Sequence, residues 1–124
     1  MSNPSFVKNY TAGGAINAYR IVKFSAAETV VLGAAATDNL IGVCSDVSPA
    51  ANERCDVYLE GMVYIEAGAA VAQGAPVTAD AVGRGVTAAP AAGANNRIVG
   101  FAIEAASAAG DLFRVLLSPG YMQG

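Results

Sequence analysis

The sequence contains no histidine and no tryptophan, and it has only two cysteines, Cys44 and Cys55. Without histidine the chain lacks the usual general base, the commonest zinc ligand and the usual partner of a serine or cysteine nucleophile. The two cysteines match no CxxC spacing, and two ligands cannot complete a tetrahedral metal site. We therefore expect no enzymatic activity, no cofactor and no metal site.

Positive charge is also scarce. Seven Lys and Arg residues are spread singly along a chain of net charge −3 and pI 4.7. A binder of phosphate backbones would gather such residues into a basic patch, so we expect no nucleic-acid partner. No apolar run approaches the ~20 residues that span a bilayer, and residues 1–10 do not resemble a signal peptide. We expect no membrane association and synthesis in the cytoplasm.

Carboxylates are more numerous, but their spacing gives little support to catalysis. Asp56 and Glu60 lie on the same predicted face of one strand, about 13 Å apart at the rise of a β-strand, which exceeds the separation that glycosidases use. A pair of carboxylates on different strands remains open from sequence, and with it an unidentified hydrolase. The glycine-rich segments contain no Walker motif. The sequence therefore gives no reason to expect a small-molecule substrate.

Large apolar side chains are few. Hydrophobic residues make up 54% of the 124 residues, but only 7% are aromatic and many of the others are alanine, which buries little area. We expect Phe24, Phe101, Ile103, Phe113 and Leu116 to carry the core. A core this thin favours support from neighbouring subunits.

Short apolar runs separated by Gly, Pro, Asn and Asp predict β-strands throughout. Between residues 60 and 87, Val63 and Ile65 share one face of a strand, Gly68 and Gly74 mark tight passages, and Asp80 begins a turn. Further strands are predicted at 18–24, 29–32, 97–104 and 111–118. We divide the chain into an extended N-terminal arm (1–10), a β domain (11–118) and a C-terminal tail (119–124).

A hairpin is predicted from residues 39–46 and 54–60, joined by a loop that contains Pro49. Folding the chain symmetrically about this loop sets Cys44 opposite Cys55, which makes the two thiols a possible pair. Two buried free thiols, a disulfide formed in oxidising surroundings and a reactive thiol are the alternatives.

Small-residue patterns recur along most of the chain and carry a resemblance to a known family. They are found at residues 9–16, 41–43 (Ile-Gly-Val), 67–80, 83–86 (Gly-Arg-Gly-Val) and 99–102 (Val-Gly-Phe-Ala). From about residue 10 to 117, the sequence resembles the tailed-phage capsid cement, or head decoration, proteins. This resemblance implies a non-enzymatic virion protein that binds the major capsid protein on the outer capsid surface, commonly as a homotrimer bridging capsomers.

With this resemblance in mind, we expect a single all-β domain, a small β-tulip-like barrel or sandwich of about seven to nine short strands with at most short helical turns. Phe6, Val7 and Tyr10 are our candidates for the capsid contact. Large apolar groups are unusual on an otherwise polar terminal arm, and an arm that orders when it binds the capsid would explain them. The main alternative is a small β module that binds a carbohydrate or a host-surface ligand. The absence of Trp and the scattered Tyr residues disfavour this alternative.

Overall fold

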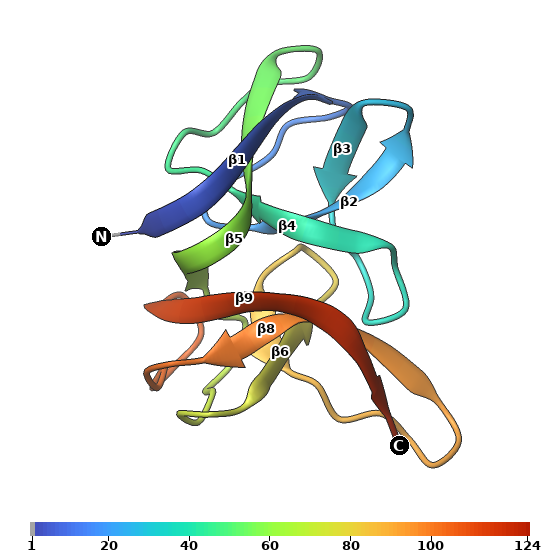
Figure 1. Cartoon of the computed structure of the whole chain (residues 1–124), viewed down its shortest axis with the longest axis vertical. Coiled ribbons are helices and arrows are strands. Elements are labelled where there is room, and N and C mark those ends of the chain that lie inside the picture. The colour runs from blue at the N-terminus through green and yellow to red at the C-terminus, as the bar shows by residue number, and fades with distance from the viewer. Residues whose placement is uncertain (1) are drawn as a thin grey trace.

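The computed structural model describes residues 2–124, which contain nine β-strands joined by turns and loops and no helix (Figure 1). The predicted all-β class is confirmed, and the strand at 29–32 has the predicted bounds. The strands are β1 (Asn3–Ala12), β2 (Ile21–Ala26), β3 (Thr29–Leu32), β4 (Leu40–Cys44), β5 (Arg54–Glu66), β6 (Pro76–Ala79), β7 (Gly85–Thr87), β8 (Asn95–Ala102) and β9 (Leu112–Gln123).

All nine strands belong to one sheet, in the order β1-β3-β2-β4-β5-β9-β8-β6-β7. Because β1 also pairs with β5, the first five strands close into a ring, in which only the β1–β3 pairing is parallel. The remaining strands continue from β5 through β9, and Figure 1 shows them as the lower half of the molecule. The architecture is therefore not a regular barrel, and the 13-residue β5 is the strand that both halves share.

Two hydrophobic clusters fill the two halves. The smaller cluster lies inside the five-strand ring and includes Val22 and Cys44, whereas the larger one includes their chain neighbours Ile21 and Val43. Consecutive side chains of a strand point to opposite faces, so β2 and β4 contribute to both clusters. This double burial explains why the sequence around β2 is apolar without a clear alternation.

The set of residues expected to form the core was largely wrong. Phe113 is fully buried and is the largest such side chain, but Phe24, Phe101 and Leu116 are 38%, 42% and 49% exposed, and Ile103 is only half-buried. In β8 the pairing with β9 shifts between Ile98 and Gly100, so that three consecutive residues are buried before Phe101 points outward. The extra residue of this bulge lies on β9, between Leu117 and Gly120, and the alternation that the sequence pattern assumes is lost in β8 beside it.

Both termini belong to the sheet, which differs from the expected arm and tail. Residues 3–11 pair antiparallel with β5, and the last residues of β9, up to Gln123, pair with the start of β8 at Asn95. Backbone groups of the terminal segments are thereby hydrogen-bonded within the sheet, and neither segment is a separate unit.

The central stretch has the predicted local structure. Val63 and Ile65 are fully buried on one face of β5. The carboxylate of Asp80 accepts hydrogen bonds from the backbone N–H groups of Val82 and Arg84, each at 2.9 Å, which forms the expected turn. A side chain at Gly68 would collide with this carboxylate, so glycine is required there by close approach.

Candidate functional site

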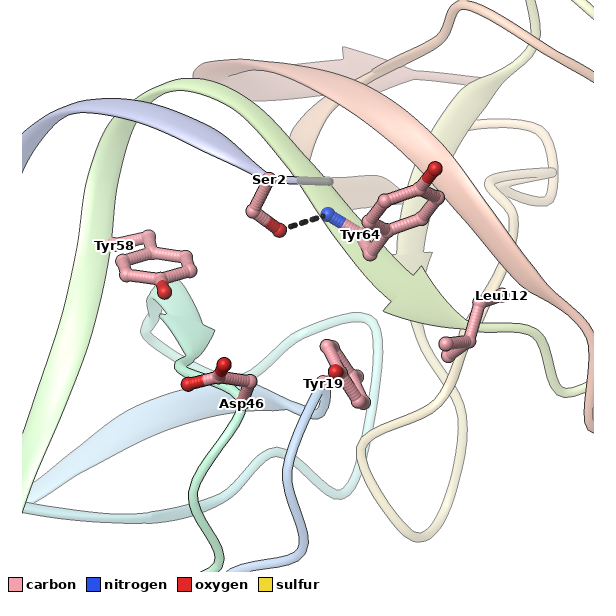
Figure 2. Close-up of a pocket in the computed structure, with 6 residues that line it drawn as sticks. All are labelled: Ser2, Tyr19, Asp46, Tyr58, Tyr64 and Leu112. Carbon is pink, nitrogen blue, oxygen red and sulfur yellow. Dashed lines mark hydrogen bonds between the residues drawn. The ribbon is translucent and has the colours of Figure 1, made fainter.

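A pocket of about 310 Å³ opens where the two halves of the molecule meet (Figure 2). Its residues come from five parts of the chain: the start of the N-terminal segment, the turn before β2, the end of β4, the middle of β5 and the start of β9. We call it the tyrosine pocket. It is lined by Ser2, Tyr19, Asp46, Tyr58, Tyr64 and Leu112.

Tyr19 has a backbone conformation that is rare for an aromatic residue. Its φ of 65° lies in the left-handed region, which costs a residue with a side chain on the order of 1–2 kcal/mol. Two hydrogen bonds hold it there: its N–H donates to the carbonyl of Ser45 at 3.2 Å, and its carbonyl accepts from the N–H of Glu66 at 3.0 Å. The fold thus maintains a strained backbone at a residue whose side chain lines the pocket.

An ion-pair network next to Tyr19 joins the two halves. The guanidinium of Arg20 bonds both carboxylate oxygens of Glu66, at 3.3 and 3.2 Å, and the carbonyl of Val82 at 3.0 Å. Glu66 also lies 3.8 Å from Arg84, which in turn pairs with Asp80 at 3.4 Å. These side chains are mostly shielded from solvent, so the network fixes the turn that carries Tyr19.

The Asp46 carboxylate gives the pocket a negative character. Burial raises the pKa of the Tyr58 hydroxyl, and the nearby charges of Asp46 and Asp56 raise it further. Ser2 Oγ accepts a hydrogen bond from the Tyr64 N–H at 2.9 Å. Within residues 2–124, the Asp46 carboxylate and the hydroxyls of Tyr19, Tyr58 and Tyr64 form no hydrogen bond. No Lys or Arg lines the pocket. The pocket therefore offers aromatic rings and an unpaired carboxylate to a ligand.

Sequence reasoning missed this pocket. It described the tyrosines as scattered, yet three of the five line one pocket. Tyr58 and Tyr64 lie on the same strand at an even spacing, which predicts a shared face and could have drawn attention to them. Tyr19 and Asp46 come from turns whose approach to β5 depends on the closure of the ring, and no local pattern indicates that.

A second feature is a row of apolar side chains on the outer face of the sheet, which we call the outer row. Met62 in β5 is paired with Leu116 in β9, Leu116 with Phe101 in β8, and Phe101 with Pro76 in β6. Directly paired residues place their side chains on the same face, so the row crosses four strands. Its alternating neighbours, such as Val115, point into the larger cluster. The row is thus an exposed apolar strip on a well-packed base.

The structure separates the three predicted capsid contacts. Phe6 and Val7 are 50% and 42% exposed, and Val7 is paired with Tyr58 of the pocket. Tyr10 is only 6% exposed and packs in the smaller cluster, with its ring 5.6 Å from that of Phe24 in an edge-to-face arrangement. Tyr10 is therefore a core residue, which corrects its assignment as a contact. It points inward because it is paired with Cys55, whose side chain faces the interior of the ring.

The two cysteines lie side by side in the smaller cluster, with their sulfur atoms 3.8 Å apart and both thiols free. The predicted register was wrong, because Cys44 is paired with Val57 rather than with Cys55. The thiols meet diagonally across the two strands. The hydrogen bond between them, together with burial, raises the pKa of Cys44, so its thiol is protonated at neutral pH and a poor nucleophile.

Among residues 2–124, no three His, Cys, Asp or Glu side chains gather where they could hold a metal ion. The same residues include no helix of the length and apolarity needed to cross a membrane. The tyrosine pocket and the outer row are thus the features that a ligand or partner could use.

Comparisons with known proteins identify the family. The family model described as phage cement protein matches residues 3–117. A search of curated protein sequences finds no match. Among solved structures, the chain is similar to the crystal structure of the head fiber gp8.5 N base in bacteriophage phi29, with a TM-score of 0.70 and 18% sequence identity over 96% of this chain and 98% of that chain. At this identity the likeness shows a shared fold. The family model covers most of the sequence, and the chain therefore belongs to the phage cement protein family, a family of phage structural proteins.

Proposed function

We propose that this protein binds the outer surface of an assembled phage capsid and stabilises it by bridging capsomers. Membership of the cement family supports a role as a component of the virion. The observation that carries the proposal is the outer row, in which Phe101 and Leu116 remain 42% and 49% exposed side by side. Contiguous apolar groups on a soluble protein are typical of surfaces that bind other proteins.

The mechanism we propose is multivalent attachment. Apolar side chains at the centre of a protein contact supply most of its binding energy, and the exposed Phe6 and Val7 on β1 would add a second apolar contact. We propose the major capsid protein as the partner and a homotrimer as the bound form. A trimer attached to one shell subunit meets the next subunit at a high effective concentration, so that separating capsomers requires breaking several contacts together.

Co-sedimentation with mature and unexpanded capsids of the protein's own phage tests this proposal. We expect saturable binding, with copies per shell in a multiple of three at each symmetry-related site. The variant Phe101→Ser/Leu116→Ser should reduce the occupancy strongly, and Phe6→Ser/Val7→Ser should reduce it less. Val82→Ser is the matched control, because Val82 is 44% exposed but lies in the turn after β6. Equal occupancy of all variants would refute the role of both surfaces, and no binding to either shell would refute the capsid role.

A further inference from the structure

The tyrosine pocket is distinct from the outer row, and its chemistry points to a ligand of its own. Tyr64 and Met62 alternate with the buried Val63 on β5, so the pocket borders the row on the same face of the strand. Binding surfaces of proteins commonly combine an apolar centre with a polar rim. The pocket, with its tyrosines and a carboxylate, has the composition of a polar rim, whereas the outer row has the composition of an apolar centre.

We propose that the tyrosine pocket binds a positively charged side chain, Arg or Lys, of a partner protein. Asp46 is an exposed residue whose carboxylate has no ion-pair or hydrogen-bond partner within residues 2–124, and in Figure 2 it lies below Tyr58 and to the left of Tyr19. Aromatic faces attract cations, and a guanidinium or ammonium group would also form charge-assisted hydrogen bonds with the carboxylate.

The pocket's surroundings favour a cation over a neutral ligand. Asp56 adds a second negative charge close enough to affect Tyr58. The cations nearest in sequence to the pocket residues are already engaged: Arg20 is paired with Glu66, Arg114 with Glu104, and Arg54 is bonded to Asn9. A neutral sugar could stack on the rings but would leave this charge uncompensated. The left-handed backbone of Tyr19 holds one wall in place before the ligand arrives, which lowers the ordering cost of binding.

A matched pair of small probes tests the proposal without any capsid. Acetyl-arginine methylamide and its citrulline counterpart have nearly the same shape, but only arginine carries a charge. In titrations followed by amide NMR spectra, we expect saturable shifts at residues 19, 46 and 58 with the arginine probe and at least about a fivefold weaker response with citrulline. Asp46→Asn should remove the preference for arginine.

Asp56→Asn is the matched control, because Asp56 contributes charge nearby but bonds Asn9 Nδ2 at 2.9 Å and does not line the pocket. It should change the arginine affinity less than Asp46→Asn does. Equal responses to the two probes, no saturable response, or an unchanged preference in Asp46→Asn would overturn the proposal. Shifts at the same residues with neutral oligosaccharides alone would assign the pocket to sugars instead. The proposal goes beyond capsid binding, and either can fail without the other.

Discussion

Phe113 and Phe101 offer the sharpest test of how this small domain is stabilised. Phe113 is fully buried in the larger cluster, whereas Phe101 is 42% exposed on the outer row. Burying a phenylalanine completely contributes about 2–3 kcal/mol, and its removal from a packed core adds the cost of a cavity, so Phe113→Ala should cost about 3–5 kcal/mol. Phe101→Ala should cost about 1–1.5 kcal/mol, because only just over half of the Phe101 surface is buried and solvent fills the space that the ring leaves.

Urea unfolding followed by circular dichroism measures both values. If Phe113→Ala does not fold, Phe113→Leu, with an expected cost of about 1–2 kcal/mol, takes its place. In thermal unfolding, each kcal/mol should lower the midpoint by about 3–5 °C for a chain of this length. A cost for Phe101→Ala equal to that of Phe113→Ala would contradict the register of β8 against β9 and mean that Phe101 points inward.

Three further predictions concern the thiols, acid stability and a close backbone approach. Oxidised glutathione should convert Cys44 and Cys55 into an intramolecular disulfide, each thiol losing one hydrogen, and should stabilise the protein by about 2–3 kcal/mol, with mass spectrometry as the readout. Hydrogen bonds from the Ser107 hydroxyl and from backbone N–H groups lower the pKa of Asp111, so its contribution is present above the unfolded pKa near 3.8 and is lost as the pH falls through the folded pKa. Asp111→Asn should therefore flatten the acid limb of a stability profile between about pH 5 and pH 2. Gly68→Ala should cost about 1–3 kcal/mol in urea unfolding, because the added methyl group would collide with the Asp80 carboxylate.

Each of these predictions has its own contrary result. Two thiols that still react with a label after oxidation and unfolding would exclude the disulfide. An acid limb of the same slope in Asp111→Asn would show that other carboxylates dominate there. Gly14→Ala is the control for Gly68→Ala, because a Cβ at Gly14 meets no heavy atom within 4 Å, and equal costs for the two would contradict the steric argument.

The sequence was sufficient to predict most of the strands between residues 18 and 118, but neither the terminal strand β1 nor the pairing of the strands. Alternation correctly placed Val63 and Ile65 on one face of a strand, and this is the face that the structure buries. Alternation failed in β8, where the register with β9 shifts and the buried run Ile98–Gly100 precedes the exposed Phe101. It also failed to place the termini, since whether residues 3–10 join the sheet depends on a partner strand about 50 residues away in the chain. A local pattern contains no information about such a partner.

The candidate site was predicted less well, for the same reason. Phe6 and Val7 are exposed as a contact requires, but Tyr10, three residues further along the strand, points into the ring. The two thiols were predicted to be neighbours, and their sulfurs lie 3.8 Å apart, but by way of a register that the structure does not have. Spacing can indicate which residues share a strand, whereas the closing of β1 against β5 decides which of them share a surface.

Stability and binding should be separable in this protein by mutation. On β5 and β9, the paired residues Val63 and Val115 are buried in the larger cluster, and the adjacent pair, Met62 and Leu116, lies on the outer row. Consecutive residues of a strand point to opposite faces, so moving by one residue along β5 or β9 takes the side chain from the core to the outer surface. Substitutions at Val63 or Val115 should therefore lower the free energy of unfolding. Substitutions at Met62 or Leu116 should mainly lower the affinity for the capsid partner. The sheet thus supports the core and the proposed contact surface with the same two strands.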